Sequence, residues 1–321
     1  MSATNEPAAD AVLLMGPTCT GKTGLALALA REFPVEIISV DSALVYRGMD
    51  IGTSKPSAAE RGCTPHHLID ICDPAERYSA GRFLRDATRL IGEIRDRGRV
   101  PLLVGGTMLY FRALTRGLAP LPEANAAVRA QIDRRAGKLG WARLHAELAL
   151  VDPEAAKRIR PGDGQRIQRA LEVLELTGQS VSALQKLAVP APFALVSFAL
   201  MPFDRGALYA RIDARFEEMM AAGFLAEVRR LHQRADLRPE LPSLRAVGYR
   251  QLWEHVRGRC ELASAVAAGQ RATRNLAKRQ LTWLRADPDA LWIRSLEDRE
   301  LGPIKRVLDK ALSRRRSAKL C

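Results

Sequence analysis

The stretch "GPTCTGKT", residues 16–23, has the spacing of a phosphate-binding loop, G-x-x-x-x-G-K-[S/T]. It follows a short apolar run, "AVLLM" at residues 11–15, and precedes a helical pattern, as the motif requires. Backbone N–H groups of such a turn point toward a bound anion at the positive end of the helix. Lys22 adds a charge for the terminal phosphates, and the Thr23 hydroxyl can coordinate Mg²⁺. The stretch therefore predicts a phosphate site at a strand-to-helix turn.

Strands and helices alternate along the chain outward from this loop. Further buried strands are predicted at residues 35–41, 100–106 and 193–201, and long helices at residues 206–232 and 261–286. This alternation is typical of α/β proteins, in which ligands bind at the carboxyl ends of parallel strands. We therefore predict a P-loop NTPase-like fold with a doubly wound parallel sheet.

The middle of the chain differs, because it contains helical patterns and no strand pattern. Asp163 is expected to cap one of these helices, and Gly178 to end it. We predict an all-helical insertion domain at residues 121–189, within a core formed by residues 1–120 and 190–321.

The positive charge is concentrated in the second part of the chain. Residues 1–120 hold 14 Lys and Arg against 13 Asp and Glu, whereas residues 121–321 hold 36 against 23. Basic side chains placed on phosphates release counterions and add affinity, so a polyanionic partner is one explanation. A soluble basic protein without such a partner is the other, and charge alone does not separate the two.

Several classes of protein are excluded by other features. No segment has the ~18 uninterrupted apolar residues of a membrane span. The N-terminus, "MSATNEPAAD", lacks the basic and apolar regions of a signal peptide. Five cysteines without a C-x-x-C pair indicate reduced thiols rather than a disulfide framework or a zinc site. We expect a cytoplasmic monomer with no membrane partner.

ATP hydrolysis would need an acidic residue at the end of a neighbouring strand. The strand at residues 100–106 is followed by Thr107 and carries no carboxylate. Asp41 is the acid at a strand end in the predicted core. It could be a magnesium ligand in a small-molecule kinase or a proton acceptor for a nucleophile, and the pattern alone leaves both open.

Longer strings of the sequence resemble one known family, the tRNA dimethylallyltransferases (isopentenyl-diphosphate:tRNA transferases). The strings are "ISVDSALVYRGMDIGTSKP", "HHLID", "YSAGRF", "PLLVGGTMLY", "RALEVLELTG", "RIDARFEEMMAAGFLAEV", "RAVGYRQLW" and "ATRNLAKRQLTWLR". They occur in the family's order and cover nearly all of the chain outside the terminal tails. The resemblance implies transfer of a dimethylallyl group from dimethylallyl diphosphate to the N6 amino group of an adenosine beside the tRNA anticodon.

The resemblance also implies roles for individual residues. The diphosphate would be held by the whole loop, namely Gly16, Pro17, Thr18, Cys19, Thr20, Gly21, Lys22 and Thr23. Asp41 would accept the proton of the adenine amino group, and Thr18 would bind the bridging oxygen of the leaving group. Arg211 is expected to bind the diphosphate, with Arg215, one helical turn away, as the alternative. Mg²⁺ on Thr23 is the expected cofactor.

The tRNA is the expected partner, and the resemblance assigns it a large set of residues. They are Asp41, Ser42, Ala43, Leu44, Thr107, Arg129, Gln165, Arg166, Ile167, Gln168, Arg169, Arg245, Ala246, Val247, Gly248, Tyr249, Arg250, Lys278, Arg279, Gln280, Leu281, Thr282, Trp283, Leu284 and Arg285. Helical spacing independently places a basic stripe on the last segment, formed by Arg271, Arg274, Lys278 and Arg285. The target base would have to leave its stack to reach the loop.

Two other functions remain as alternatives. A small-metabolite kinase of the P-loop class would turn over ATP but would make no use of the basic second part. A non-catalytic RNA-binding module would use the loop only to hold a phosphate. Changing Asp41 separates this module from an enzyme, since a module has no rate to lose.

Overall fold

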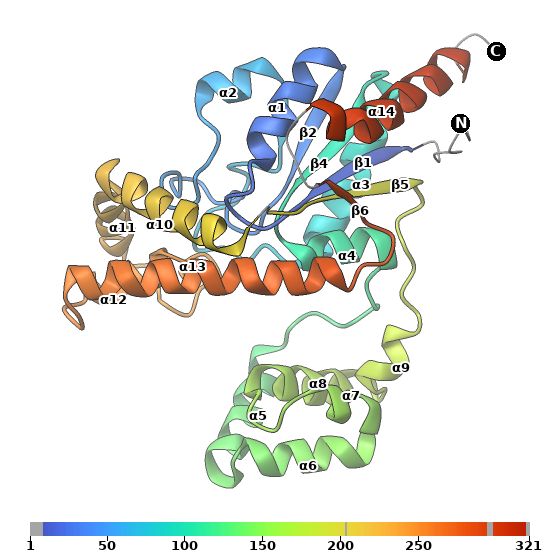
Figure 1. The fold of residues 1–321 in the computed structure, drawn as a ribbon. Helices are drawn as coiled ribbons and strands as arrows, with labels where there is room; N and C mark the ends of the chain where they lie inside the picture. The colour runs from blue at the N-terminus through green and yellow to red at the C-terminus, as the bar shows by residue number, and fades with distance from the viewer. Residues whose placement is uncertain (1–8, 203, 294–297, 319–321) are drawn as a thin grey trace. The chain divides into compact units, whose positions relative to one another are not determined.

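The computed structural model of the chain describes residues 9–202, 204–293 and 298–318 (Figure 1). Residues 1–8, on which the signal-peptide expectation rests, lie outside the described part. The chain forms two compact units, one of Met1–Arg112 with Pro192–Cys321 and one of Ala113–Ala191. No described helix is both long enough and apolar enough to cross a membrane.

The first unit is built on a parallel sheet whose strand order is β3-β2-β4-β1-β5-β6. The strands are β1 (Ala11–Met15), β2 (Val35–Val40), β3 (His66–His67), β4 (Val100–Gly105), β5 (Leu195–Leu200) and β6 (Leu291–Ile293). The predicted parallel α/β sheet is confirmed. The two shortest strands, β3 and β6, were not predicted.

Helices cover both faces of the sheet (Figure 1). On one face, α1 (Lys22–Glu32) and α14 (Asp298–Ala318) pack on alternate residues of the strands, such as Leu14 and Phe198. On the other face, α3 (Ala80–Asp96) packs against β2 and β4. Burial on both faces explains why the long strands are continuous apolar runs.

The remaining helices of this unit are α2 (Ala58–Cys63), α4 (Met108–Arg116), α10 (Arg205–Ala221), α11 (Phe224–His232), α12 (Tyr249–Val256) and α13 (Leu262–Arg285). Helix α2 packs beside α1, and the others include a group in which α12 packs on α11 and α13, and α13 on α10. Helix α13 matches the prediction, but the segment 206–232 is divided. The division lies at Gly223, whose φ of 100° is a left-handed conformation that interrupts the helix.

Within its described residues the second unit contains the end of α4, five further helices and an isolated bridge between Leu118 and Val189. The further helices are α5 (Ala126–Leu139), α6 (Trp141–Val151), α7 (Pro153–Arg158), α8 (Gly164–Thr177) and α9 (Val181–Gln185). As expected, the Asp163 side chain accepts from the N–H of Arg166, and Gly178 ends α8 with a φ of 68°.

The sheet brings three loops together, because β2, β4 and β1 are neighbours and all run in one direction. The loop at residue 16, Asp41 and the turn at residue 106 follow the ends of these strands. At Gly105 a side chain would not fit, since its Cβ would lie 2.0 Å from the carbonyl oxygen of Val40. This close approach joins the ends of β2 and β4 beside the phosphate-binding loop.

Candidate active site

The phosphate-binding loop lies between β1 and α1, and two of its side chains donate hydrogen bonds to its own backbone. The Thr20 hydroxyl donates to the carbonyl oxygen of Pro17 at 2.8 Å, and Lys22 Nζ donates to the same oxygen at 2.6 Å. Gly21, the N-cap of α1, has a φ of 85°, which glycine adopts without strain. Cys19 also has a positive φ, 62°, which is uncommon for a residue with a side chain. The turn is therefore tightly defined.

Lys22 is the cation of this loop, and its surroundings disfavour its charge. Burial lowers the pKa of Lys22 to about 8, although the charges of Asp41 and Cys19 act in the opposite direction. The Arg215 guanidinium lowers this pKa further. A phosphate beside Lys22 would restore the charged form, so the loop is electrostatically prepared for an anion.

Asp41 follows β2 and folds back on its own turn. Its Oδ1 accepts the N–H of Ala43 at 2.8 Å and the N–H of Leu44 at 3.3 Å. Both hydrogen bonds fix the carboxylate without using Oδ2. Asp41 is thus held in one orientation at the mouth of the loop.

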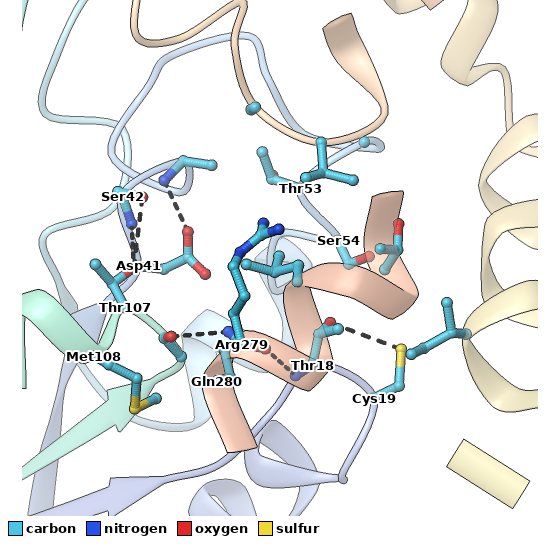
Figure 2. A pocket seen from close by; sticks show the side chains of 18 of the residues that line it. Thr18, Cys19, Asp41, Ser42, Thr53, Ser54, Thr107, Met108, Arg279 and Gln280 are labelled. Carbon is cyan, nitrogen blue, oxygen red and sulfur yellow. Dashed lines mark hydrogen bonds between the residues drawn. The ribbon is translucent and has the colours of Figure 1, made fainter. Parts of the chain in front are cut away.

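Thr107 connects the ends of β2 and β4. Its N–H donates to the carbonyl oxygen of Val40 at 3.1 Å, and its Oγ1 accepts the N–H of Ser42 at 3.0 Å. These bonds hold the Asp41 turn against the start of α4. Figure 2 shows Thr18, Asp41 and Thr107 around the same cavity.

Two cavities adjoin at this point and share Thr18, Asp41 and Arg215. The smaller cavity, about 380 Å³, is also lined by Lys22 and Thr23. The larger cavity has a volume of about 530 Å³. Its lining is mixed: polar residues such as Asp41, Ser42 and Thr107 lie in it together with an apolar set, Met108, Leu109, Ile212, Phe216, Met219, Leu276 and Trp283. One cavity thus suits a charged phosphate group and the other an apolar or aromatic group of moderate size.

The two candidate arginines of α10 have different positions. Arg215 lines both cavities, and its Nε donates to the Ser54 hydroxyl at 2.9 Å. Arg211 is exposed and lines neither cavity. The geometry therefore favours Arg215, the alternative, over Arg211.

Comparison with known proteins identifies the relationship of the whole chain. A sequence profile described as IPP transferase matches residues 44–287, and one described as isopentenyl transferase matches residues 9–70. A tRNA dimethylallyltransferase of Bordetella parapertussis is 57% identical over 286 residues, which is 88% of this chain and 91% of the relative. The chain belongs to the IPP transferase family. A second member, from Cupriavidus necator, is 54% identical over 96% of this chain and 97% of its own length.

Solved structures of the IPP transferase family have the same fold. The full-length tRNA isopentenylpyrophosphate transferase of Bacillus halodurans is 36% identical, with a TM-score of 0.69 over 97% of this chain and 99% of its own. A eukaryotic dimethylallyltransferase acting on tRNA has a TM-score of 0.76 at 25% identity, over 93% of this chain and 77% of its own. The resemblance seen in the sequence is thus confirmed at the level of the family.

The residues that this family resemblance assigned to tRNA divide into exposed and buried groups. On α13, Lys278, Arg279, Thr282, Trp283 and Arg285 are exposed. Of the predicted basic stripe, Arg271, Lys278 and Arg285 are exposed, whereas Arg274 is half-buried and paired with Asp213. Arg279 and Trp283 also line the larger cavity. Before α12, Arg245, Ala246 and Val247 line this cavity too, and Arg250 is exposed. Ser42, Ala43 and Thr107 line this cavity as well.

Several of the assigned side chains are buried, and for them the prediction of RNA contact is corrected. Ile167 and Tyr249 are completely buried, Leu284 is 1% exposed, and Gln280 is 8% exposed. Ile167 belongs to the core of the second unit. Leu281 is partly buried against the Leu208 cluster. Ile167, Tyr249 and Leu284 line neither cavity and support their helices, whereas Gln280, although 8% exposed, lines both cavities.

Two of the arginines of the insertion that were assigned to tRNA already have a partner within the unit. Arg129 and Arg169 both bind Glu172, which is completely buried, at 2.9 Å and 2.6 Å respectively. Arg169 also donates to the carbonyl oxygen of Pro122. Burial by itself would raise the pKa of Glu172, but the two arginines outweigh it and hold this pKa below its ordinary value. Both arginines are structural parts of the unit.

The other residues of the insertion that were assigned to tRNA are exposed or half-buried. Gln165 and Arg166 are exposed at the start of α8. Gln168 is half-buried, and its side chain donates to Asp133 at 2.6 Å. Within the described unit, Gln165 and Arg166 are therefore the best-placed of the assigned side chains to meet a phosphate backbone.

Sequence reasoning missed the loop at residues 50–55, which contributes Gly52, Thr53 and Ser54 to the larger cavity. It also missed Glu227, a buried carboxylate that binds the backbone of this loop. The string "MDIGTSKP" was part of the family resemblance, and its glycine and hydroxyl residues were the signal that could have identified a binding loop.

Proposed function

We propose that the protein transfers a dimethylallyl group from dimethylallyl diphosphate to the N6 amino group of an adenosine adjacent to the tRNA anticodon, with release of diphosphate. The observation that carries the proposal is the pair of adjoining cavities that share Asp41 and Thr18. Family membership supports it, since the relatives are named tRNA dimethylallyltransferases.

The two cavities divide the substrates by their chemistry. The diphosphate occupies the smaller cavity, against the loop N–H groups, Lys22 and Arg215. The dimethylallyl group and the adenine meet in the larger cavity, beside its apolar residues. An adenine inside a stacked loop does not reach this position, so the base is drawn out of the stack before it reacts.

The reaction exchanges one bond for another. The adenine amino nitrogen attacks the allylic carbon, the carbon–oxygen bond breaks, and its electron pair leaves with the diphosphate. The loop N–H groups, Lys22, Thr18 and Arg215 stabilise the charge that grows on the leaving group. Asp41 takes the proton from the nitrogen, so that a neutral secondary amine remains on the base.

A divalent cation fits the donor set at the start of α1. Among the described residues no cluster of three or more His, Cys, Asp or Glu side chains could hold a metal alone. Thr23 lines the smaller cavity. Its hydroxyl, diphosphate oxygens and water molecules would together form the all-oxygen coordination that Mg²⁺ prefers, since Mg²⁺ usually keeps several water ligands. Bound there, Mg²⁺ would supply further charge stabilisation to the leaving diphosphate.

The tRNA is bound through exposed basic residues in both units. Lys278, Arg279 and Arg285 contact phosphates beside the larger cavity, and Arg245 and Arg250 extend this surface. The insertion, which we take as a tRNA-clasping domain, adds Gln165 and Arg166. The concentration of positive charge after residue 120 supports this arrangement.

An isotope-transfer assay tests the proposal. The protein is incubated with Mg²⁺, unmodified tRNA and dimethylallyl diphosphate labelled in its carbon chain, and label is then measured in the RNA. The proposal requires label in the RNA and an equal amount of released diphosphate. ATP turnover without transfer would support the kinase instead, and RNA binding without either reaction would support a binding module.

A further inference from the structure

Gln280 lies in the C-terminal part of α13 (Leu262–Arg285), and its side-chain amide connects two loops of the site. Its Oε1 accepts the N–H of Thr18 at 3.0 Å, and its Nε2 donates to the carbonyl oxygen of Gly106 at 2.8 Å (Figure 2). The side chain is 8% exposed, so both hydrogen bonds are shielded from water. Each end of the amide is thus satisfied by backbone of a different loop.

The chemistry of the contact demands a carboxamide. One partner is an N–H donor and the other a carbonyl acceptor, so the side chain must offer an acceptor and a donor together. Glutamate would place an acceptor against the oxygen of Gly106, and methionine would leave both backbone groups unpaired. Gly106 is suited to the contact as well, because a Cβ there would lie 2.4 Å from Nε2 of Gln280.

The two loops lie beside different groups in the proposed reaction, one beside the leaving diphosphate and the other beside the adenine base. Thr18 lies on the side of the leaving diphosphate. Gly106 precedes Thr107, whose hydrogen bonds to Val40 and Ser42 hold the Asp41 turn on the side of the base. Gln280 is therefore a direct link between the leaving-group side and the proton-accepting side.

We propose that Gln280 is a positioning residue. It lines both cavities, but its amide is bound to the backbone of Thr18 and Gly106, so it acts by setting the distance between the Thr18 loop and the Asp41–Thr107 wall. Its neighbours Lys278 and Arg279 are exposed on the same helix. A single helix therefore carries both the proposed RNA contacts and the spacer of the active site. This inference rests on the proposed function.

Hydrogen–deuterium exchange tests the link without reference to activity. Gln280→Met is compared with Gln270→Met, a matched change on the same helix at a residue that lines neither cavity. Exchange of the Thr18 N–H should rise about tenfold or more in Gln280→Met and stay unchanged in Gln270→Met. An unchanged Thr18 rate in Gln280→Met would overturn the inference.

The kinetic effect should fall on the chemical step. Loss of two buried hydrogen bonds predicts a fall of about 10- to 100-fold in kcat for Gln280→Met, with an affinity for the anticodon stem-loop within about twofold of the wild type. A parallel loss of RNA affinity would mean that Gln280 binds RNA directly. If the wild type transfers no prenyl group, the proposed function fails, while the exchange experiment still tests the link.

The pH dependence of the activity of Gln280→Glu provides a second test of the positioning role. When protonated, the introduced carboxyl has one donor and one acceptor and reproduces the carboxamide. Burial raises the pKa of such a group, so the activity of Gln280→Glu relative to wild type should recover as the pH falls from 8 to 6. A constant activity ratio across this range would contradict the positioning role.

Discussion

The hydroxyl of Tyr249 donates a hydrogen bond of 2.5 Å to Oε1 of Glu227, and both side chains are buried. The same carboxylate accepts the N–H groups of Asp50, Ile51 and Gly52 at 2.9, 2.9 and 3.1 Å. The loop at residues 50–55 is thereby held to α11 and α12 while it lines the larger cavity. Burial, with the Glu227 charge, raises the pKa of Tyr249, so this hydroxyl stays protonated.

This relationship predicts unequal effects of two conservative changes. Tyr249→Phe removes one hydrogen bond to a charged group and should lower the free energy of unfolding by about 1.5–3 kcal/mol. Glu227→Gln places an amide NH₂ among N–H donors and should lower it by about 3–5 kcal/mol. Urea unfolding measures both values. A smaller loss for Glu227→Gln than for Tyr249→Phe would show that the carboxylate does not hold the loop.

Asp41→Asn separates proton transfer from binding. The amide oxygen can still accept the N–H groups of Ala43 and Leu44, so the turn is preserved, but the side chain no longer accepts a proton. We expect kcat to fall by about 100- to 10,000-fold, with tRNA affinity within about twofold. Single-turnover kinetics and an RNA-binding titration measure the two quantities. Retention of the full rate would remove Asp41 as the base.

Lys22 should take up a proton when the diphosphate binds. Its pKa of about 8 means that half of the side chains are neutral at pH 8, whereas the bound anion favours the charged form. Calorimetry in two buffers of different ionisation enthalpy should therefore detect uptake of about half a proton at pH 8. Affinity should fall as the pH rises above 8, where the neutral form predominates.

Lys22→Arg is the control for this titration, because a guanidinium stays charged throughout this range. Its diphosphate affinity should be independent of pH between 7 and 9, and its binding should take up no proton. Equal proton uptake by the two proteins would place the titrating group elsewhere.

The two arginines of α10 form a matched pair for testing the diphosphate site. Arg215→Gln removes a cation that lines both cavities and should weaken dimethylallyl diphosphate binding by about 10- to 100-fold. Arg211→Gln changes an exposed residue outside both cavities and should alter this affinity by less than about twofold. Equilibrium binding decides the assignment, and a larger effect at Arg211 would reverse it.

Two neighbouring arginines of α8 should have opposite phenotypes. Arg166→Gln removes an exposed charge, so tRNA affinity should fall and the slope of log affinity against log salt should decrease by about one unit, with no change in Tm. Arg169→Gln removes a partner of the buried Glu172 and should lower Tm by about 4 °C or more.

The pH dependence of the Glu172 contribution follows from the direction of its shift. Because its folded-state pKa is below the ordinary value, the stabilisation is present above the unfolded-state pKa and is lost as the pH falls through the folded-state pKa. The difference in Tm between wild type and Arg169→Gln should accordingly shrink in acid. A difference that grows in acid would contradict this account of Glu172.

The phosphate-binding loop and the long strands could be predicted because their signals are local. The glycine spacing of residues 16–23 and the apolar runs at β1, β2 and β4 each appear within a few residues. The strands β3 and β6 have two and three residues, which is too short for a periodic pattern. Helix α14 was not predicted.

The assignment of individual arginines and of Gln280 depended on distant contacts. Arg211 and Arg215 share one helix face, and only Ser54, far away in sequence, distinguishes them. Arg169 was assigned to tRNA from the sequence, but it binds the buried Glu172 on its own helix and the carbonyl oxygen of Pro122, which is distant in sequence. Gln280 follows the buried Ala277 by three residues, so its face was predictable, but its polar type indicated the surface.

Analysis of the product by nucleoside mass spectrometry tests the central claim most directly. Unmodified tRNA is incubated with the wild-type protein, Mg²⁺ and dimethylallyl diphosphate, with Asp41→Asn in parallel, and the RNA is then digested and sequenced by mass. The account predicts an N6-dimethylallyl adenosine beside the anticodon with the wild type and little or none with the variant. Unmodified adenosine in the wild-type reaction, or equal modification by both proteins, would contradict it.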